Sequence, residues 1–370
     1  MTRTVTVVGA GPAGLAAARI LGREGVDFIL IDSKSFPRYK GCGGGLTPRS
    51  IRVLGEIFPE IEPGGFETRE ISFRNVDEGV ARDLVTYISK RPLFFTVDRK
   101  ELDHSLLKSV IDRGGNFAVS KVREIEKTDG GFLVKGENLE IESKFVIVAG
   151  GVFGAKLANL EPPAYGIVYH GYSSPTGSAS ITFMQDGYLW KFPGESFDSI
   201  GGGVYPDAQN VPAYEEMEML IKRTFDEDVE LTGTPIPLFK MEKVLELNKA
   251  FEGLFFAGDS AGLVDNWTGE GIDFALDSGR QAALSIVEDG IKGKTAGQRY
   301  LERLYPIVKH LQIADSFRRR FHADLQKNVL LLKSRRSARI FMNYISRYAE
   351  NVSLLVFKSF FTGGIHQRST

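Results

Sequence analysis

The sequence predicts an α/β protein with an antiparallel-sheet domain and a helical C-terminal region, and three observations support this prediction. Residues 4–8 and 28–31 are nearly continuous apolar runs, which is typical of parallel strands buried on both faces. Residues 160–249 are rich in turns and aromatic residues, as antiparallel strands are. Residues 299–370 place apolar residues among many basic ones in helical segments.

The composition excludes several classes of protein. Of the 370 residues, 42% are hydrophobic and 25% charged, which is ordinary for a globular protein and excludes a disordered or fibrous chain. Cys42 is the only cysteine, which excludes an internal disulfide framework and a cysteine-rich metal site, and we expect no metal and no nucleic-acid partner. The sequence has neither an apolar run of about 18 residues nor a signal-peptide pattern, which predicts a cytoplasmic location.

A glycine-rich fingerprint follows the first predicted strand. Its parts are Gly9-Ala10-Gly11-Pro12-Ala13-Gly14, a helix-prone run at 15–21, the second strand at 28–31 and the acid Asp32. Gly9 allows a tight turn, Gly11 lets the backbone approach a pyrophosphate, and Gly14 lets the helix pack closely on the strand. The helix N-terminus offers N–H groups to the phosphates, and Asp32 is placed to accept a hydrogen bond from a ribose hydroxyl. This unit predicts a bound dinucleotide but does not distinguish FAD from NAD.

A second stretch closes one strand and opens a helix near residue 98. Asp98 is the expected N-cap, Glu101 holds the position of a capping box, and residues 101–111 follow as an amphipathic helix. Arg99 projects from the first turn. Taken alone, Arg99 is interpreted as a solvated surface charge.

A third stretch favours FAD over NAD. The apolar strand at 253–257 ends in Gly258-Asp259, and Gly269-Glu270-Gly271-Ile272 opens a long helix that continues to residue 286. Asp259 at a strand end can bind a ribityl or phosphate-linked hydroxyl. The glycines let the helix N-terminus reach the cofactor ring, where its positive end stabilises an anionic reduced flavin. A nicotinamide site does not need this third piece.

At this point the sequence resembles the flavoprotein superfamily typified by p-hydroxybenzoate hydroxylase and, more closely, its geranylgeranyl reductase family. The resemblance covers about residues 4–290 and rests on five markers in order. They are the Gly9–Gly14 fingerprint with Asp32, the Cys-Gly-rich loop at 36–46, Arg99 with Asp103, the Tyr-x-Trp-x-Phe-Pro signature at 188–193, and Gly258-Asp259 with 269–272.

This resemblance implies a Rossmann-like FAD-binding domain assembled from discontinuous segments, and a set of site residues. The implied cofactor-binding residues are Gly9, Gly11, Pro12, Ala13, Gly14, Asp32, Ser33, Lys34, Cys42, Gly43, Gly44, Arg99, Asp259, Gly269, Gly271 and Ile272. The implied catalytic residues are Cys42, Tyr188 and Trp190, and the implied substrate-binding residues are Phe66, Tyr188, Trp190 and Phe192.

The chain departs from the superfamily after the strand at 145–149, where hydroxylases carry an Asp-Gly pair and this chain has Gly150-Gly151. This departure argues against the interpretation of the chain as an NAD(P)H-dependent hydroxylase. Residues 150–154 could form a second fingerprint, but no strand, helix, strand and acid follow them. The same holds for the glycines at 201–203. We therefore expect no dedicated nicotinamide domain.

The aromatic signature lies in a predicted antiparallel meander. Strands are expected at 180–184, 188–192 and 198–205, with a turn at 185–187. Alternation places Tyr188, Trp190 and Phe192 on one face. This wall is either a packed core or, as the resemblance implies, the lining of an isoprenoid tunnel that ends at the flavin. Residues 92–95 are expected to add to that lining.

Cys42 has two interpretations. A cysteine in a glycine loop is often inert buried filler, but this loop can approach the flavin closely, which favours a role in gating or protonation. The candidates for the acid that protonates the substrate are Tyr188, Cys42 and His170, and the sequence favours none of them over the others.

These observations predict an FAD-dependent reductase that saturates carbon–carbon double bonds of geranylgeranyl chains on lipids or prenyl diphosphates. Its electrons would come from an external donor, ferredoxin-like or NAD(P)H. The alternatives are a monooxygenase or quinone-linked dehydrogenase, and a non-catalytic prenyl-binding carrier. We expect an FAD-binding domain at 1–65, 96–160 and 250–290, a substrate-binding domain at 66–95 and 161–249, and a C-terminal helical region at 291–370.

The C-terminal region differs from the rest in charge. Residues 299–370 carry 14 Lys and Arg against 4 Asp and Glu, about +10, whereas the preceding residues carry about −11. The basic residues at 318–320 and 333–339 lie among apolar ones such as Leu330 and Phe341. Either this region is a solvated helical bundle, or it contacts an anionic membrane surface, with residues 352–361 inserting shallowly.

Overall fold

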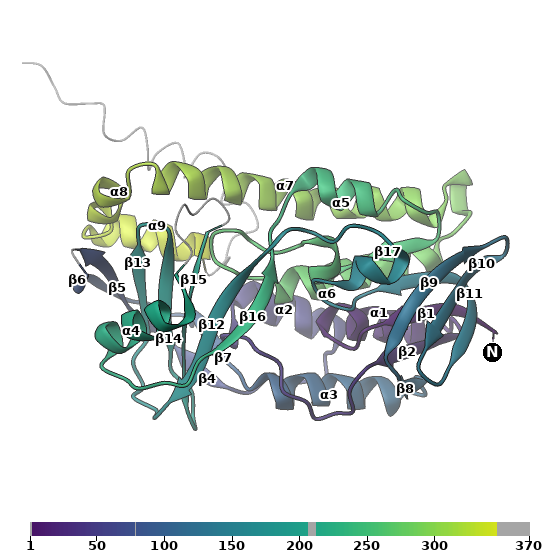
Figure 1. Ribbon diagram of the computed structural model, residues 1–370, viewed down its shortest axis with the longest axis horizontal. Coiled ribbons are helices and arrows are strands. Elements are labelled where there is room, and N and C mark those ends of the chain that lie inside the picture. The colour runs from purple at the N-terminus through teal and green to yellow at the C-terminus, as the bar shows by residue number, and fades with distance from the viewer. Residues whose placement is uncertain (1, 78, 206–211, 346–370) are drawn as a thin grey trace, which may run out of the picture.

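The computed structural model describes residues 2–77, 79–205 and 212–345. Within these residues a mostly parallel sheet and a mostly antiparallel sheet lie at opposite ends of the molecule, and helices run along both (Figure 1). This arrangement confirms the predicted fold class.

The mostly parallel sheet has the strand order β8-β2-β1-β11-β10-β9, and β17 pairs with β11. Its strands are β1 (Thr2–Val8), β2 (Phe28–Asp32), β8 (Phe117–Val119), β9 (Val122–Thr128), β10 (Gly131–Gly136), β11 (Glu140–Val148) and β17 (Leu254–Phe256). Strand β1 is parallel to both β2 and β11, so the chain leaves β1 at a point where strand order reverses. Ligands of open α/β sheets bind at the carboxyl ends of strands at such a point.

Helices connect the strands along the described part of the chain. They are α1 (Pro12–Arg23), α2 (Pro48–Ile57), α3 (Arg99–Ile111), α4 (Tyr214–Phe225), α5 (Met241–Leu247), α6 (Ile272–Val287), α7 (Ala296–His322), α8 (Leu325–Leu331) and α9 (Arg335–Ile345). Short 3-10 turns are η1 (Gly154–Ala158), η2 (Gly258–Ala261) and η3 (Ile291–Gly293). The helices predicted at 15–21, 101–111 and 272–286 are present as α1, α3 and α6.

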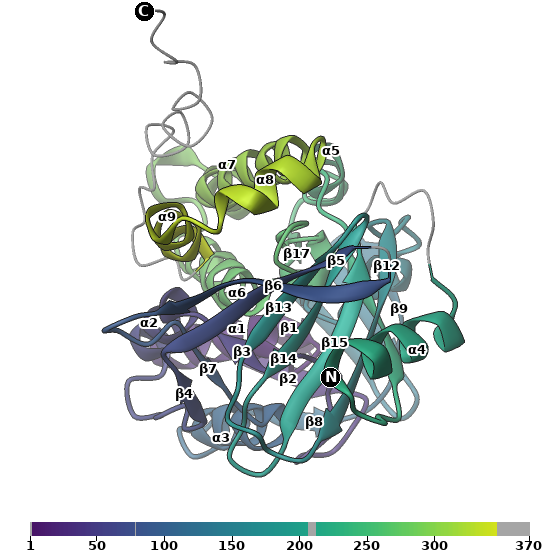
Figure 2. The same ribbon diagram turned by 90° about the vertical axis from the view of Figure 1, so that its left-hand side faces the viewer.

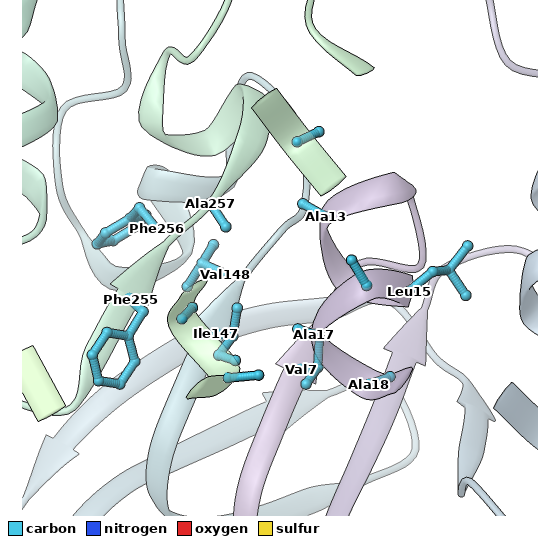
Figure 3. Close-up of a cluster of buried hydrophobic side chains, with 14 of the residues drawn as sticks. Val7, Ala13, Leu15, Ala17, Ala18, Ile147, Val148, Phe255, Phe256 and Ala257 are labelled. Atoms are coloured by element: carbon cyan, nitrogen blue, oxygen red, sulfur yellow. The ribbon is translucent and has the colours of Figure 1, made fainter. Parts of the chain in front are cut away.

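Close packing between α1 and α6 joins two distant parts of the chain. A Cβ atom on Gly279 would lie 1.9 Å from the Ala13 carbonyl oxygen, so only glycine allows this approach. Figure 3 shows the core beneath, where Ala17 of α1 lies beside Val7 of β1, and Ile147 of β11 and Phe255 of β17 belong to the same buried cluster. This packing brings the N-terminal ends of both helices to the same side of the sheet.

The second sheet has the order β16-β12-β15-β14-β13-β5-β6. Its strands are β5 (Glu70–Asp77), β6 (Val80–Ile88), β12 (Tyr165–Ser173), β13 (Ser180–Met184), β14 (Gly187–Phe192), β15 (Asp198–Val204) and β16 (Thr232–Pro237). The predicted meander is present as β13, β14 and β15, with antiparallel pairing throughout. Strand β13 also pairs in parallel with β5 from far earlier in the chain. Strands β3 (Gly45–Leu46), β7 (Phe94–Thr96) and β4 (Phe66–Thr68) form a small third sheet.

The two faces of the second sheet differ. Helix α4 lies on its outer side (Figure 2), where Leu189 packs with Met217 and Ile221. Tyr188 and Trp190 lie on the other face, as the alternation predicts, and the Trp190 ring covers Gly201 of β15. A Cβ atom at Gly201 would lie 2.2 Å from that ring, so this glycine makes room for the indole.

Candidate active site

A cavity of about 620 Å³ connects the two large sheets. At one end it is lined by the fingerprint turn, at the other by the inner face of the antiparallel sheet. The residues that mark its two ends are Gly11 and Asp32 at the first, and Tyr188, Trp190 and Phe192 at the second. One continuous space thus joins the predicted cofactor and substrate residues.

The N-terminus of α1 opens directly into this cavity. Gly11 is the N-cap residue and Pro12 the first helical residue, and among the described residues no side chain caps the helix. A Cβ atom on Gly11 would have no described atom within 4 Å other than its chain neighbours, so it would enter the cavity. Gly9 has a φ of +101°, and a Cβ atom on Gly14 would lie 1.8 Å from the Gly9 carbonyl oxygen. Exposed N–H groups at a helix N-terminus fit a pyrophosphate.

Asp32 and Arg38 form the polar wall beside that helix end. The Asp32 carboxylate accepts hydrogen bonds from the backbone N–H groups of Ala10 at 2.8 Å and Lys34 at 3.0 Å. Arg38 lies 3.7 Å from Asp32 and donates to the Ala10 carbonyl at 3.2 Å. Both side chains are 11% exposed and line the cavity. The pair offers an acceptor for a ribose hydroxyl and a cation near the phosphates.

Arg99 is buried, not exposed, so the interpretation of it as a solvated surface charge is wrong. Its guanidinium donates to both carboxylate oxygens of Asp103, at 2.9 and 3.0 Å. Burial lowers the pKa of Arg99, but Asp103 and Cys42 outweigh it and raise the pKa above its ordinary value. Asp98 caps α3 as predicted, through the N–H of Lys100 instead of Glu101.

The third stretch brings a second helix N-terminus to the same cavity. Gly271 is the N-cap of α6, with no capping side chain among the described residues, and a Cβ atom there would lie 3.6 Å from the Asp259 carboxylate. Asp259, Gly269, Gly271 and Ile272 all line the cavity. A flavin ring at this point would lie against the positive end of α6.

The aromatic wall is held in place by hydrogen bonds at its back and edge. The Tyr188 hydroxyl donates to the Thr268 carbonyl at 2.5 Å, and the Trp190 indole donates to the Ser199 hydroxyl at 3.3 Å. Phe192 packs on Phe94 with ring centroids 4.7 Å apart. Burial, together with nearby Glu270 and Asp265, raises the pKa of Tyr188 well above its ordinary value, so the phenol stays protonated.

Beyond the aromatic wall the cavity is apolar. Phe341 of α9 is 6% exposed and packs against Phe73, Phe183, Trp267 and Phe321. The apolar residues that line this end include Ile71, Leu93, Phe94, Phe183, Phe341 and Met342. The wall has the chemistry of a hydrocarbon site.

Most predicted site residues line this cavity, and three do not. Gly14 lies inside α1, where its contact with Gly9 serves helix packing. Phe66 lies in β4 and is not among the lining residues, whereas Leu93 and Phe94 from the predicted 92–95 stretch are. His170 is 1% exposed and lies behind Gly41, whose Cβ atom would be 2.5 Å from its ring.

Sequence reasoning missed several lining residues. They include Arg38, Tyr39, Ser120, Lys121, Thr234, Glu270, Trp267, Phe341 and Met342. Arg38 lies in the glycine loop that the sequence did identify, and Ser120 and Lys121 follow a strand end, where ligands of parallel sheets bind. Those two signals could have been used. Phe341 and Met342 reach the cavity only through long-range packing of α9.

No group of His, Cys, Asp or Glu within the described part of the chain is arranged to hold a metal ion. None of the described helices is long and apolar enough to cross a membrane.

Comparisons with known proteins agree with this geometry. The sequence profile of an FAD binding domain family matches residues 2–59. A menaquinone reductase from Mycolicibacterium smegmatis is 30% identical, with 84% of this chain and 83% of that one covered. A digeranylgeranylglycerophospholipid reductase from Methanosphaera stadtmanae is 26% identical, with 80% and 81% covered. The structure of a geranylgeranyl bacteriochlorophyll reductase-like protein from Thermoplasma acidophilum has a TM-score of 0.71 at 20% identity, with 98% and 96% covered.

The fold and the cavity therefore define an FAD-dependent oxidoreductase, with FAD as its cofactor. More narrowly, the chain belongs to the geranylgeranyl reductase family of FAD-dependent reductases, together with the menaquinone reductases that it resembles over most of its length.

Proposed function

We propose that this reductase saturates carbon–carbon double bonds in the isoprenoid chain of a lipid or a prenyl diphosphate. The observation that supports this function is the continuous cavity. One end is polar and is lined by the N-termini of two helices, and the other end is apolar and aromatic. A long hydrocarbon substrate needs many apolar contacts and few polar ones. The names of the related geranylgeranyl reductases point to the same substrate class.

The predicted cofactor residues would hold FAD along the polar end. The pyrophosphate would lie at the N-terminus of α1, the adenosine ribose at Asp32, and the ribityl chain at Asp259. When bound and reduced, FAD supplies a hydride from N5 of its ring. We further propose that residues 1–65, 96–160 and 250–290 form the FAD domain and that 66–95 and 161–249 form the substrate domain.

The protein's own contribution is positioning and exclusion of water. An isolated alkene is poorly polarised, so holding it against the flavin ring in a dry cavity should supply much of the acceleration. Trp190 and Phe192 would hold the chain beside the loop that carries Cys42. A Cβ atom on Gly43 of that loop would lie 3.2 Å from the Trp190 indole nitrogen, so loop and wall are in direct contact.

A second substrate is favoured by one specific relative. The 30% identical menaquinone reductase suggests a quinone as the molecule that enters the cavity. A quinone with an isoprenoid tail would place its tail in the same apolar end. The two reactions differ in where hydrogen is gained, on carbons of the isoprenoid chain or on the oxygens of the quinone.

The oxidation state of the flavin, measured by its absorbance, tests this function. Purified protein would be reduced without oxygen and mixed with geranylgeranyl diphosphate, a digeranylgeranyl glycerol ether lipid, menaquinone or a fully saturated analogue. We expect the unsaturated prenyl compounds to restore the absorbance of oxidised FAD and the saturated analogue to leave it unchanged. If none of the prenyl compounds reoxidises the flavin, the proposed function is wrong.

We also propose that the enzyme contacts an anionic membrane surface to reach lipid substrates and that a separate electron donor reduces its flavin. Two residues of the basic region are buried and would not take part in this contact. Arg318 is 3% exposed and faces Asp315, and Phe341 is part of the interior, so neither serves as an anchor. Exposed basic and apolar residues between positions 319 and 339 include Arg319, Arg320, Lys327, Leu330, Leu331, Lys333, Arg336 and Arg339, while residues 352–361 lie outside the described part.

Vesicle binding tests this contact. Each basic residue near an anionic surface contributes on the order of 1 kcal/mol, and salt screens the attraction. We expect the protein to sediment with anionic but not neutral vesicles at low salt and to be released as salt rises. Binding that is absent at low salt, or unchanged at high salt, would rule out an electrostatic anchor.

A further inference from the structure

We propose that Tyr39, His170 and Thr234 form a hydrogen-bonded path that carries the proton for alkene reduction from the protein surface into the cavity. This inference rests on the proposed function, because saturation of a double bond needs one hydride and one proton. It names a route for the proton that the aromatic wall does not provide. The Tyr188 phenol already donates to the Thr268 carbonyl and its pKa is raised, so it is poorly placed to give up a proton.

The path consists of two hydrogen bonds. The Tyr39 hydroxyl lies 3.4 Å from Nδ1 of His170, and Nε2 of His170 lies 3.0 Å from the Thr234 hydroxyl. Tyr39 is 53% exposed and also lines the cavity, His170 is 1% exposed, and Thr234 lines the cavity. A solvent-accessible hydroxyl, a buried imidazole and a cavity hydroxyl are therefore linked in that order.

Strand register explains why Thr234 faces the substrate. In the antiparallel sheet Thr234 pairs with Val168, Val168 with Gly203, and Gly203 with Tyr188. Residues directly opposite one another on paired strands point to the same face. Thr234, Val168 and Tyr188 all line the cavity, so the hydroxyl of Thr234 belongs to the same wall as the aromatic signature.

His170 occupies the next row of the same face. It pairs with Gly201, which in turn pairs with Trp190. Alternation would point His170 into the cavity, but the glycine loop covers it. A Cβ atom on Gly41 would lie 2.3 Å from the Thr234 hydroxyl and 2.5 Å from Nε2 of His170. The loop thus packs on both the imidazole and the Thr234 hydroxyl, and His170 reaches the cavity lining through its hydrogen-bond partners Thr234 and Tyr39.

The electrostatics keep the imidazole neutral, as a relay requires. Burial, and then the positive charge of Lys40, lower the pKa of His170 below its ordinary value. The other titratable groups around it are Tyr39 and Tyr172, and burial raises the pKa of Tyr172 above its ordinary value. A neutral imidazole can accept a proton at one nitrogen while it donates from the other.

The proton balance is as follows. One alkene carbon gains a hydride and its neighbour gains the proton of the Thr234 hydroxyl, so a double bond becomes a single bond and the cofactor loses two electrons. Thr234 regains a proton from Nε2 of His170, Nδ1 takes one from Tyr39, and Tyr39 takes one from water. Thr234 is the catalytic residue of this path, and His170 and Tyr39 act through it.

The test compares variants that remove a single hydroxyl. Thr234→Val and Tyr39→Phe keep the shape of each side chain, Thr234→Ser restores the hydroxyl, and Thr232→Val is a control on an exposed position of the same strand. Reduced protein would be mixed once with geranylgeranyl diphosphate without oxygen. We expect Thr234→Val to slow saturation by about a hundredfold, the size of general acid catalysis, with FAD content unchanged. Thr234→Ser should recover most of the rate, and Thr232→Val should match the wild-type rate.

A second readout does not depend on turnover. The ring nitrogen resonances of His170 report its hydrogen bonds, so we expect Thr234→Val to shift the Nε2 signal and Tyr39→Phe the Nδ1 signal. If the wild-type protein leaves every prenyl compound unchanged, the proposed function fails and the path fails with it. If the wild type reacts but both variants react equally fast, or if the His170 signals do not move, the path alone is wrong.

Discussion

Single glycines in and around the fingerprint turn and in α6 differ in what a side chain would meet. Gly9, Gly14 and Gly279 face backbone atoms at 2.3 Å or less from an added Cβ atom, so they fix the approach of α1 to its neighbours. Gly11 instead faces open space at the helix end. Substitution at the first group should damage the fold, whereas substitution at Gly11 should damage cofactor binding alone.

Gly11→Val tests this distinction. Gly11 has a φ of −81°, which any residue can adopt, so the variant should keep the fold. The valine side chain would, however, occupy the space of the pyrophosphate. We expect FAD affinity to fall at least tenfold, which corresponds to about 1.4 kcal/mol, by titration of the apoprotein. Gly55→Val, at another open glycine position, is the control that should keep its flavin. Full FAD occupancy in Gly11→Val would mean that the fingerprint is misassigned.

At the scale of elements, β14 and β15 work as a unit because glycines of one strand accommodate aromatic rings of the other. Gly201 lies under the Trp190 indole, and Gly202 lies against Leu189 on the opposite face, 2.4 Å from an added Cβ atom. The aromatic wall is therefore flat against the sheet and leaves the cavity open. A larger residue on β15 would push the wall into the substrate space.

Gly201→Ala should show this coupling. An added Cβ atom would also lie 2.4 Å from the Tyr169 carbonyl, so overpacking should cost about 1–3 kcal/mol of unfolding free energy. We expect a lower melting temperature, altered tryptophan fluorescence and weaker substrate binding with FAD retained. Gly166→Ala, which would meet no described atom within 4 Å, should behave as the wild type. Equal stability of the two variants would contradict the packing described for Trp190.

Local patterns predicted some elements well and others not at all. The fingerprint around Gly11 and the alternation at Tyr188 and Trp190 are encoded within a few residues, and both were predicted. The burial of Arg99 was not: its partner Asp103 lies one helical turn away, but the Cys42 loop reaches Arg99 only in the folded chain. The place of Thr234 in the wall depends on strand register, and that of Phe341 on packing of α9. Neither follows from local sequence.

At the scale of the whole molecule, α7 connects the parallel sheet to the apolar end of the cavity (Figure 1). Near its start, the Tyr300 hydroxyl donates to the Phe256 carbonyl at 2.8 Å. Near its end, Asp315 accepts from Asn266 at 3.1 Å and from Arg318 at 3.1 Å, and Arg318 lies over the Tyr205 ring. The helix thus contacts residues near both ends of the cavity and fixes their positions relative to each other.

Asp315→Asn tests this role. Burial raises the pKa of Asp315, but hydrogen bonds from Arg319, Asn266 and Arg318 outweigh it and lower the pKa below its ordinary value. A lowered carboxyl pKa contributes stability that is present above pH 3.8 and lost as the pH falls through the lower, folded-state value. Loss of the carboxylate beside buried Arg318 should cost about 3–5 kcal/mol near neutral pH.

Urea unfolding at several pH values measures that difference. We expect the gap between the wild type and Asp315→Asn to be constant near neutral pH and to shrink below pH 3.8. Glu302→Gln is the control, because Glu302 lies on the same helix as Asp315 and its exposed ion pair with Lys294 should contribute little. A gap that is absent at neutral pH, or that grows in acid, would contradict the role given to Asp315.

The most direct measurement of the proposed function follows hydrogen into the product. Protein reduced without oxygen in deuterated water would be incubated with a digeranylgeranyl lipid and with menaquinone, and the products analysed by mass spectrometry with fragmentation. We expect deuterium pairs to accumulate stepwise on the isoprenoid chain, one pair for each double bond saturated. Chains that stay unlabelled, with menaquinone reduced only at its two oxygens, would contradict an isoprenoid reductase.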